Sequence, residues 1–439
     1  MSGCRAPRHR PLLLPPPFRS VPPLSLTAAD CDRLDAGPEA PAFAAWRARF
    51  AAGAPGTVYL DANSIGPMPL AAPARVQAAL DAGWRVARRR SWNEFDWLEQ
   101  PRALGAGLAP VLGAGPDDVR VGESTTVNQY RLLRLALALK APRRVIVVER
   151  EVFPSNRYAA QGIAHAGLAE LRFVPQADAA ALAQALAPGD VAVVALSHVD
   201  YRHSLRLDMA ALTAQVQAAG ALALWDLSHS AGAVAVDLRG SQADLALGCG
   251  YKYLCGGPGA PSFVYAHPRW QDAAWPAVCG WMGHADTFAF EPDFRPAPGM
   301  DRFLVGTPAV LANAAFSAAA ELWRGVDPVL LDARHRSLTD TLGALVAQEC
   351  GALGVEVSSP REHVRRGGHV ALRFAHAGAL AQALVAHGVV VSARKPDALR
   401  LGVHPLTTTH AELWQAVQVL RGLLDSGAWR EPRYQGSSV

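Results

Sequence analysis

One lysine stands alone in the stretch GCGYKYLCGGPG, residues 248–259. Between Leu245 and Ala266 the only charged residue is Lys252, which is set among small and apolar side chains. Burying an unpaired ammonium is costly, so this setting favours the neutral amine. A neutral amine can attack a carbonyl carbon and form a Schiff base. The glycines that follow would let a ligand approach the backbone closely, so the stretch predicts carbonyl chemistry at Lys252.

A carboxylate stands at the end of the apolar run LALW, where Asp226 follows the tryptophan. A buried carboxylate needs a cationic partner, and His229 follows three residues later, where it could approach the same centre. An aspartate that caps the next helix explains this position equally well. The position of Asp226 alone therefore does not decide between a catalytic carboxylate and a helix cap.

Polar or aromatic residues also follow two other predicted strands. Thr125 and Thr126 open a helix in ESTTVNQYRLL, and a helix N-terminus attracts anions through its free N–H groups and its dipole. Ordinary capping by Ser124 or Thr125 is the alternative. Phe153, which follows RVIVVEREV, is either an aromatic platform at the sheet edge or part of the core.

Taken together, these positions describe a site for pyridoxal phosphate (PLP). The helix start would hold the phosphate, and the aromatic ring would stack on the cofactor. Asp226 would pair with the pyridine nitrogen and keep it protonated, so that the ring can accept electrons. Lys252 would carry the cofactor as a Schiff base. No GxGxxG motif occurs in GCGYKYL to support a dinucleotide site instead.

Short apolar runs and helical stretches alternate from about Val58 onward. The runs predicted to be strands begin at Arg144, Leu171, Asp190, Gly220, Asp244 and Pro261. This alternation predicts an α/β fold with a large domain built on a mainly parallel sheet that is flanked by helices. Ligands of such sheets bind beyond the carboxyl ends of the strands, where the polar residues described above lie.

A second section begins at about Asp327 and predicts a smaller C-terminal α+β domain. It contains a long helix, strands at 369–374, 389–394 and 398–404, and a final helix from Ala411. The predicted boundaries are a disordered Pro/Arg-rich extension at 1–27, a helical segment at 28–57, the large domain at 58–325, the small domain at 326–430 and a tail at 431–439.

The composition predicts neither a nucleic-acid nor a membrane partner. The net charge is +4, and the longest basic block, Arg88–Arg90, lies on an amphipathic stretch that predicts a solvated helix face. The six cysteines are scattered, without CxxC pairs or zinc-like spacing, which indicates a reducing, cytoplasmic compartment and no metal site. No apolar run approaches the roughly 20 residues of a membrane helix.

The chain resembles the PLP enzymes of the aspartate-aminotransferase fold and, within their class V group, the kynureninase family. The matching segments run from about Tyr59 to His410, and the most specific are WDLSHSAG, YKYL followed by GGPG, and GWMGH. The resemblance implies PLP as the cofactor and a large-domain sheet of the seven-stranded type. It also implies hydrolysis of the Cβ–Cγ bond of L-kynurenine to anthranilate and L-alanine, a reaction of tryptophan catabolism and NAD biosynthesis.

By that resemblance, Lys252, Tyr251 and Asp226 are catalytic. The residues of one subunit that it implies for the cofactor are Thr125, Thr126, Phe153, Ser197, Asp226, His229, Tyr251 and Lys252. Arg400 of LRLG matches the arginine that binds the substrate carboxylate, and Trp92 matches a substrate-binding position. The family acts as a homodimer with a shared active site, which implies that Trp281 and Thr307 reach the cofactor of the other subunit.

Three features depart from the family pattern. Asn156 stands where the family usually has Asp, and an amide can accept a hydrogen bond but carries no charge. Thr407 stands where the family commonly has the Tyr of PLY, which would change the substrate pocket. The third is the Pro-rich N-terminal extension. Trp92 and Thr307 themselves resemble the bacterial form, which prefers kynurenine to 3-hydroxykynurenine.

Other PLP proteins of this fold provide the alternatives. GWMGH argues against a class V aminotransferase. A cysteine desulfurase needs a nucleophilic cysteine, and Cys350, which follows a helix, lacks the usual His and Arg neighbours. A non-catalytic PLP-binding homologue would be expected to lose Lys252 or Asp226, and both are present.

Overall fold

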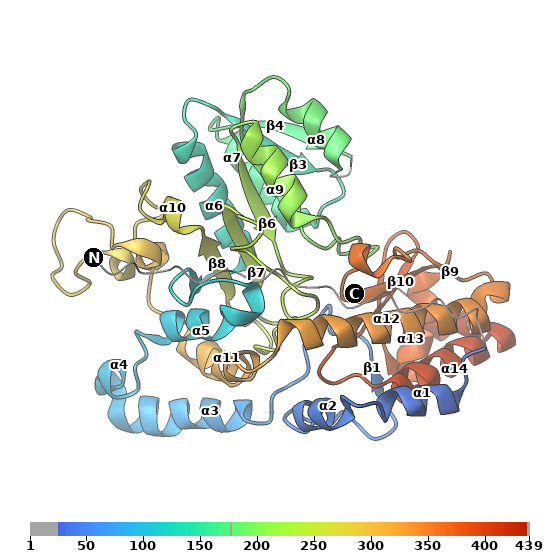
Figure 1. Cartoon of the computed structure of the whole chain (residues 1–439). Helices are drawn as coiled ribbons and strands as arrows, with labels where there is room; N and C mark the ends of the chain where they lie inside the picture. Colours follow the sequence, from blue (N-terminus) through green and yellow to red (C-terminus); the bar gives the residue numbers. More distant parts are fainter. Residues whose placement is uncertain (1–24, 176–177, 437–439) are drawn as a thin grey trace, which may run out of the picture.

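The computed structural model describes residues 25–175 and 178–436 and is built around a seven-stranded sheet (Figure 1). The strand order is β2-β8-β7-β6-β5-β3-β4, and every pair is parallel except the two that include β8. The strands are β2 (Val119–Val121), β3 (Val145–Glu149), β4 (Glu170–Val174), β5 (Val191–Ser197), β6 (Leu222–Asp226), β7 (Leu245–Cys249) and β8 (Ser262–Ala266). The predicted α/β fold with a mainly parallel sheet is confirmed.

Helices cover both faces of this sheet because successive strand residues point to opposite sides. Val147 packs into the core beneath α5, α8, α9 and α11, whereas its neighbour Val148 packs into the core beneath α6 and α7. The helices of this part are α5 (Gln100–Leu108), α6 (Thr125–Leu139), α7 (Pro154–His165), α8 (Ala179–Leu186), α9 (Met209–Ala218), α10 (Pro268–Gln271) and α11 (Val310–Trp323).

A second sheet, antiparallel and four-stranded, lies in the C-terminal part of the chain, with the order β12-β13-β10-β9. The elements of this part are α12 (Pro328–Cys350), β9 (Glu356–Val357), β10 (His369–Arg373), α13 (Ala377–Ala386), β11 (Val389–Val390), β12 (Ser392–Arg394), β13 (Ala398–Gly402) and α14 (His410–Ser426). Apolar side chains of α12, α13 and α14 pack with this sheet in one core. The division into two domains follows these separate cores.

The first strand, β1 (Val58–Tyr59), pairs with β11 of the C-terminal part rather than with the large sheet. Val58 and Leu60 lie in the C-terminal core. The prediction that the large domain begins at residue 58 is therefore wrong for this strand. A two-residue strand carries too little pattern to reveal a partner more than 300 residues away.

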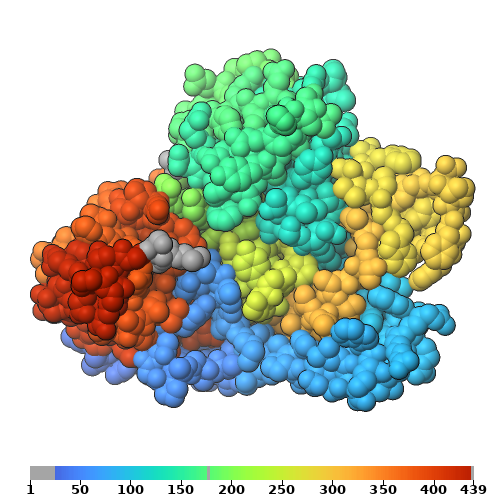
Figure 2. Space-filling model, turned by 180° about the vertical axis from the view of Figure 1, so that it is seen from behind, coloured from blue at the N-terminus to red at the C-terminus, as the bar shows by residue number. Residues whose placement is uncertain are grey.

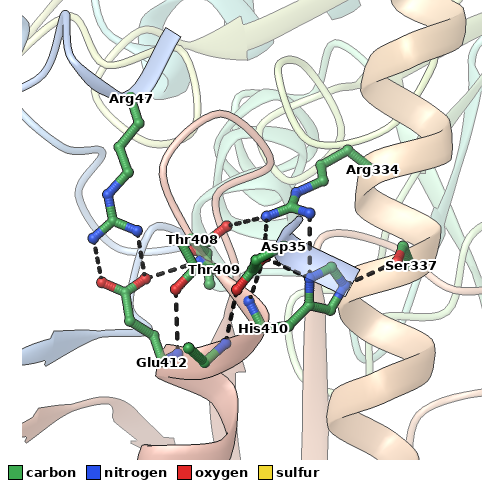
Figure 3. Close-up of polar contacts among 9 residues, drawn as sticks. Asp35, Arg47, Arg334, Ser337, Thr408, Thr409, His410 and Glu412 are labelled. Atoms are coloured by element: carbon green, nitrogen blue, oxygen red, sulfur yellow. Dashed lines mark hydrogen bonds and ion pairs between the residues drawn. The ribbon is translucent and has the colours of Figure 1, made fainter. Parts of the chain in front are cut away.

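The N-terminal helices α1 (Ala28–Asp35) and α2 (Ala40–Arg47) are fastened to the start of α14 (Figure 3). The Asp35 carboxylate accepts the backbone N–H groups of His410 and Ala411, each at 3.0 Å, and forms an ion pair with Arg334 at 3.0 Å. Arg47 forms an ion pair with Glu412 at 2.6 Å. Asp35 thus supplies, from outside the helix, acceptors for N–H groups that the first turn of α14 leaves free.

The inner boundaries of both predicted terminal segments differ from those expected. Most of the predicted extension, residues 1–24, lies outside the described residues, but Leu26 N–H donates to Gln348 and Thr27 caps α1. At the other end Tyr434 is buried in the C-terminal core, so residues 431–436 belong to that domain and are not a tail. Residues 437–439 lie outside the described residues.

The chain leaves β1 for α3 (Ala72–Ala78), which continues as a π-helix over Ala79–Ala87 and is followed by α4 (Ser91–Glu94). Seen from behind, these N-terminal residues form a blue band along the base of the molecule (Figure 2). Arg88–Arg90 are exposed, and Arg90 pairs with Glu94 at 2.9 Å. Within residues 25–175 and 178–436, no helix is long and apolar enough to cross a membrane.

Candidate active site

A cavity of about 480 Å³ lies beyond the carboxyl ends of β5, β6 and β7. Ser197 and Asp226 are the last residues of adjacent parallel strands and are register partners, which places them side by side. The predicted site residues that line the cavity are Thr125, Thr126, Phe153, Ser197, Asp226, His229, Tyr251, Lys252 and Thr307. The structure therefore brings nine of the predicted site residues together at one edge of the sheet.

Lys252 extends into this cavity from the loop after β7, and its Nζ lies 3.0 Å from Nε2 of His229. We expected a buried lysine, but the side chain is only partly buried because it faces the cavity. Burial, and then the nearby charge of Lys252, hold the pKa of His229 well below its ordinary value. The imidazole is therefore neutral near pH 7, and its Nε2 can accept a hydrogen bond from the lysine amine.

Asp226 is buried, and it meets two neutral donors. The side-chain amide of Asn156 donates to Oδ2 at 2.6 Å, and the backbone N–H of Ser228 donates to Oδ1 at 2.8 Å. The expected cationic partner is not among the hydrogen bonds and ion pairs of Asp226 in the described part of the chain. Asp226 thus makes a local turn contact and also presents a carboxylate to the cavity, where a protonated ring nitrogen would supply the missing positive charge.

The first turn of α6 opens onto the same cavity. Ser124 is the N-cap, and its hydroxyl accepts the N–H of Val127 at 3.3 Å. Among the described residues, no backbone acceptor or side chain binds the N–H groups of Thr125 and Thr126. Capping by Ser124 and anion binding are therefore compatible, because the cap satisfies only one of the free donors.

Phe153 lies at the cavity and not in the core, with 41% of its surface exposed. Its ring meets the edge of Tyr201 at a centroid distance of 5.3 Å, and Nζ of Lys252 lies 5.7 Å from its centroid. This placement supports the aromatic platform over the core alternative. Tyr201 also lines the cavity, and it lies in the stretch LSHVDYR, within the range from Tyr59 to His410 over which the chain resembles the family.

Tyr251 lines the cavity beside Lys252 and is partly buried. Burial, together with Cys249 and Asp226, raises the pKa of Tyr251 to about 12. The phenol therefore keeps its proton near neutral pH and acts as a donor. It can donate to an anionic ligand or return a proton to a reacting atom, which fits the cofactor-binding and catalytic roles that the resemblance implies for it.

Most glycines near Lys252 serve packing and do not provide access for a ligand. A Cβ added at Gly250 or Gly256 would lie 2.6 Å from the ring of Phe316 in α11. Gly259 lines the cavity, at a φ of +71° that favours glycine. The expectation that this loop's glycines admit the ligand is thus wrong for Gly250 and Gly256 and stays a prediction for Gly259.

Three predicted residues lie outside the cavity wall. Arg400 is 1% exposed and sits behind Tyr201, whose carbonyl accepts its Nη1 at 2.9 Å. Trp92 packs edge-on against Trp97, with 5.4 Å between the ring centroids, and both line a neighbouring groove. Thr307 lines this groove and the cavity. Trp281 is 38% exposed and lines neither space.

Thr407 lines neither the cavity nor the groove of Trp92, but a separate hollow beside α2. This hollow shares no lining residue with the cavity, so the expected effect of the threonine on the substrate pocket is not seen in this chain. Asn156, by contrast, contacts the catalytic carboxylate directly.

The donor set of the cavity fits PLP. One end offers the free N–H groups and hydroxyls of the α6 start for a phosphate, and the middle offers a carboxylate and an exposed aromatic face. The buried Nδ1 of His229 has no hydrogen-bond partner among the described residues. Because Nε2 accepts from Lys252, Nδ1 carries the proton, so this atom is a further unused donor. Lys252 supplies the amine that a cofactor aldehyde requires.

The described cysteines offer no nucleophile to this cavity. Cys31, Cys249, Cys255 and Cys350 are buried, and none of them, nor the exposed Cys279, lines its wall. Burial raises the pKa of Cys350 to about 12, which disfavours the reactive thiolate. Within the described ranges there is also no group of three or more His, Cys, Asp or Glu residues arranged to hold a metal ion.

Solved structures of the same fold include PLP enzymes. A cysteine desulfurase from Escherichia coli superposes with a TM-score of 0.71 at 20% identity, covering 88% of this chain and 98% of that one. A C-DES mutant with glycine covalently linked to its PLP cofactor has a TM-score of 0.70 at 20% identity, covering 85% and 98%. At these identities the likeness shows the fold alone.

Closer relatives define the family. The kynureninase C-terminal domain model matches residues 331–420. The kynureninase of Burkholderia mallei strain SAVP1 is 42% identical over 386 residues, which cover 86% of this chain and 92% of the relative. The kynureninase of Deinococcus radiodurans is 42% identical over 407 residues, which cover 91% and 98%. The chain therefore belongs to the kynureninase family.

Proposed function

We propose that this protein hydrolyses the Cβ–Cγ bond of L-kynurenine to give anthranilate and L-alanine. It is a PLP-dependent hydrolase of the kynureninase family, and the proposal extends that statement to the substrate and to the role of each residue. The observation that carries it is the meeting of Lys252, Asp226 and the open start of α6 in one cavity. These are the amine, the acid and the anion site that PLP requires.

The side chains of the cavity would hold the cofactor along its length. Thr125, Thr126 and the α6 dipole would bind the phosphate, and Tyr251 would donate a hydrogen bond to it. Phe153 would stack on the ring, and Asp226 would pair with the pyridine nitrogen. When bound, PLP supplies an electron sink for the carbanion that forms at the substrate α-carbon.

Lys252 would have two tasks. Its Nζ would hold the cofactor aldehyde and, once the substrate amine has displaced it, would take the α-proton as a base. His229 stays neutral through burial, so it adds no positive charge beside the amine. Tyr251, which keeps its proton near neutral pH, would supply a proton as the Cβ–Cγ bond breaks.

The substrate would be oriented by groups beside and beyond the cavity. Arg400 would bind the α-carboxylate, because a guanidinium can hold both oxygens at once. Trp92 would bind the substrate, and Trp281 and Thr307 of the partner subunit would complete the site in a homodimer. Thr307 also lines the cavity of its own chain. The likeness of Trp92 and Thr307 to the bacterial form supports a preference for kynurenine over 3-hydroxykynurenine. The free cysteines of the described residues support a cytoplasmic location.

A substrate panel tests this function. The protein is loaded with PLP and offered L-kynurenine, L-cysteine, or an amino acid with a keto-acid acceptor. We expect anthranilate fluorescence from the first and neither sulfide nor a new amino acid from the others. Sulfide release or amine transfer without anthranilate would assign the cavity to a different reaction of this fold.

A further inference from the structure

Arg400 is a buried cation whose hydrogen-bond partners in the described chain are all neutral. Its Nη1 donates to the carbonyl of Tyr201 at 2.9 Å, and its Nη2 donates to the hydroxyls of Ser392 at 2.8 Å and Ser64 at 3.4 Å. With its amide oriented to satisfy both neighbours, Asn63 accepts from Nε at 3.1 Å and from Nη2 at 3.2 Å. None of the ion pairs among the described residues involves Arg400. Its charge therefore stays available to an incoming carboxylate.

A single carboxylate lies behind the two serines. Oδ1 of Asp61 accepts the Ser64 hydroxyl at 2.8 Å and the Ser392 hydroxyl at 2.6 Å. A hydroxyl has one proton and two acceptor lone pairs. Because Asp61 takes both protons, the serine oxygens are left with lone pairs to receive Arg400. Asp61 thus sets the direction of both hydroxyls without pairing with the arginine directly.

The loop that carries Asp61 also reaches the lysine. The N–H of Gly66 donates to the carbonyl of Tyr251 at 2.9 Å, and a Cβ at Gly66 would collide with the carbonyl of Lys252. At the other end, a Cβ at Gly402 would collide with the side chain of Asn63. Residues 61–66 therefore form a short bridge between Arg400 on β13 and the Lys252 loop after β7.

We propose that Asp61 is a positioning residue that holds Arg400, through Ser64 and Ser392, in the orientation that receives the substrate α-carboxylate. The inference rests on the proposed function, since it deepens the role given there to Arg400. Asp61 then has two opposing effects on the binding of the substrate carboxylate. The serine contacts favour carboxylate binding, whereas the negative charge of Asp61 opposes it.

Two substitutions of Asp61 should therefore change carboxylate binding in opposite directions. Asp61→Ala removes the acceptor, so the hydroxyls and Arg400 lose their fixed direction. Asp61→Asn keeps an oxygen that can accept both hydroxyls and removes the negative charge. Burial raises the pKa of Asp61, against the hydrogen bonds from Ser392 and Ser64 and the charges of Arg400 and Arg394.

The test uses the PLP-loaded full chain and follows cofactor absorbance while L-alanine or ethylamine is added. These amines differ in the α-carboxylate and are otherwise alike. We expect Asp61→Ala to weaken L-alanine binding about tenfold, the scale of a lost hydrogen bond to a charged group, with ethylamine binding unchanged. Asp61→Asn should bind L-alanine as tightly as the parent protein or more tightly. With L-kynurenine, Asp61→Ala should raise KM about tenfold and change kcat less than about threefold.

Ser392→Ala provides a second variant should Asp61→Ala fold poorly, and it should also weaken L-alanine binding without affecting ethylamine. Asp332→Ala is the matched control, because Asp332 is a partly buried carboxylate that pairs with Arg206 away from the cavity. Equal loss of L-alanine affinity in Asp61→Asn and Asp61→Ala, or an equal loss for ethylamine, would overturn the inference. If the parent protein binds L-alanine more tightly than ethylamine but does not cleave L-kynurenine, the role of Asp61 stands and the proposed substrate is wrong.

Discussion

Nζ of Lys252 lies 3.0 Å from Nε2 of His229, in a cavity that also holds the Asp226 carboxylate. The two nitrogens reach this distance because the loop after β7 and the turn after β6 leave adjacent parallel strands at the same edge of the sheet. Burial keeps the imidazole neutral, so it receives the lysine N–H and does not repel the amine. The cavity therefore brings together the Lys252 amine, the Asp226 carboxylate and the N-terminus of α6.

Arg400→Ala should abolish turnover and leave cofactor binding intact. Arg400 contacts none of the groups proposed to hold PLP, but it donates to the carbonyl of Tyr201, a residue of the cavity wall. We expect kcat/KM for L-kynurenine to fall by about a thousandfold or more, the scale of a lost bidentate charge pair. The visible absorbance of the bound cofactor should persist. Arg373→Ala, an exposed arginine on β10, is the control, and equal turnover in the two variants would remove Arg400 from the carboxylate role.

Asn156→Ala should weaken PLP binding about tenfold. The Asn156 amide donates to Asp226 at 2.6 Å, and both side chains are buried, so the substitution leaves a carboxylate oxygen without its donor. The dissociation constant of PLP from the apoprotein measures the effect. Gln161→Ala, at an exposed position of α7, should bind PLP normally. Parent-like affinity in Asn156→Ala would show that this amide does not orient Asp226.

Asp35→Ala should lower the free energy of unfolding by about 2–3 kcal/mol. Although burial opposes it, hydrogen bonds from His410, Ala411 and Arg334 hold the pKa of Asp35 well below its usual range. The folded state therefore gains stability from the charged form above pH 4, and this gain is lost as the pH falls toward the lowered pKa. Urea unfolding at pH 7 measures the loss, with the exposed Asp32→Ala on the same helix as control. A loss below about 0.5 kcal/mol would show that Asp35 does not fasten α1 to α14.

The protein should lose stability as the pH falls from 6.5 to about 4. Burial holds the pKa of His335 and of His404 at about 4. In the unfolded chain both histidines become protonated once the pH falls below the ordinary histidine pKa near 6.5. In the folded protein they become protonated only at about pH 4. The unfolded state thus binds more protons in this window, and each histidine lowers the free energy of unfolding by about 1.4 kcal/mol per pH unit.

Urea unfolding at pH 7, 6 and 5 measures this slope. His335→Gln should reduce it relative to the parent protein, because one of the buried imidazoles is removed. His165→Gln, at an exposed position, should leave it unchanged. Identical slopes in His335→Gln and the parent would show that His335 has the same pKa in the folded and the unfolded state.

The sheet and the residues at its strand ends could be predicted from the sequence, because consecutive strands leave the same edge of a parallel sheet. Local pattern thus placed Thr125, Phe153, Asp226 and Lys252 in one site. Contacts between distant segments left no such signal. The pairing of β1 with β11, the position of Arg400 behind Tyr201, and the link from Asp61 through Ser392 each join segments separated by about 200 residues or more. Local periodicity reports which face of an element is buried and not which distant partner covers it.

Product stoichiometry with and without Lys252 tests the central claim most directly. The PLP-loaded protein is incubated with L-kynurenine, and anthranilate and L-alanine are both quantified. We predict equal amounts of the two products from the parent protein, and a rate lower by about a thousandfold or more in Lys252→Ala, the scale of a lost catalytic base. Products in unequal amounts, or parent-like turnover by Lys252→Ala, would contradict the assignment of Lys252 to this reaction.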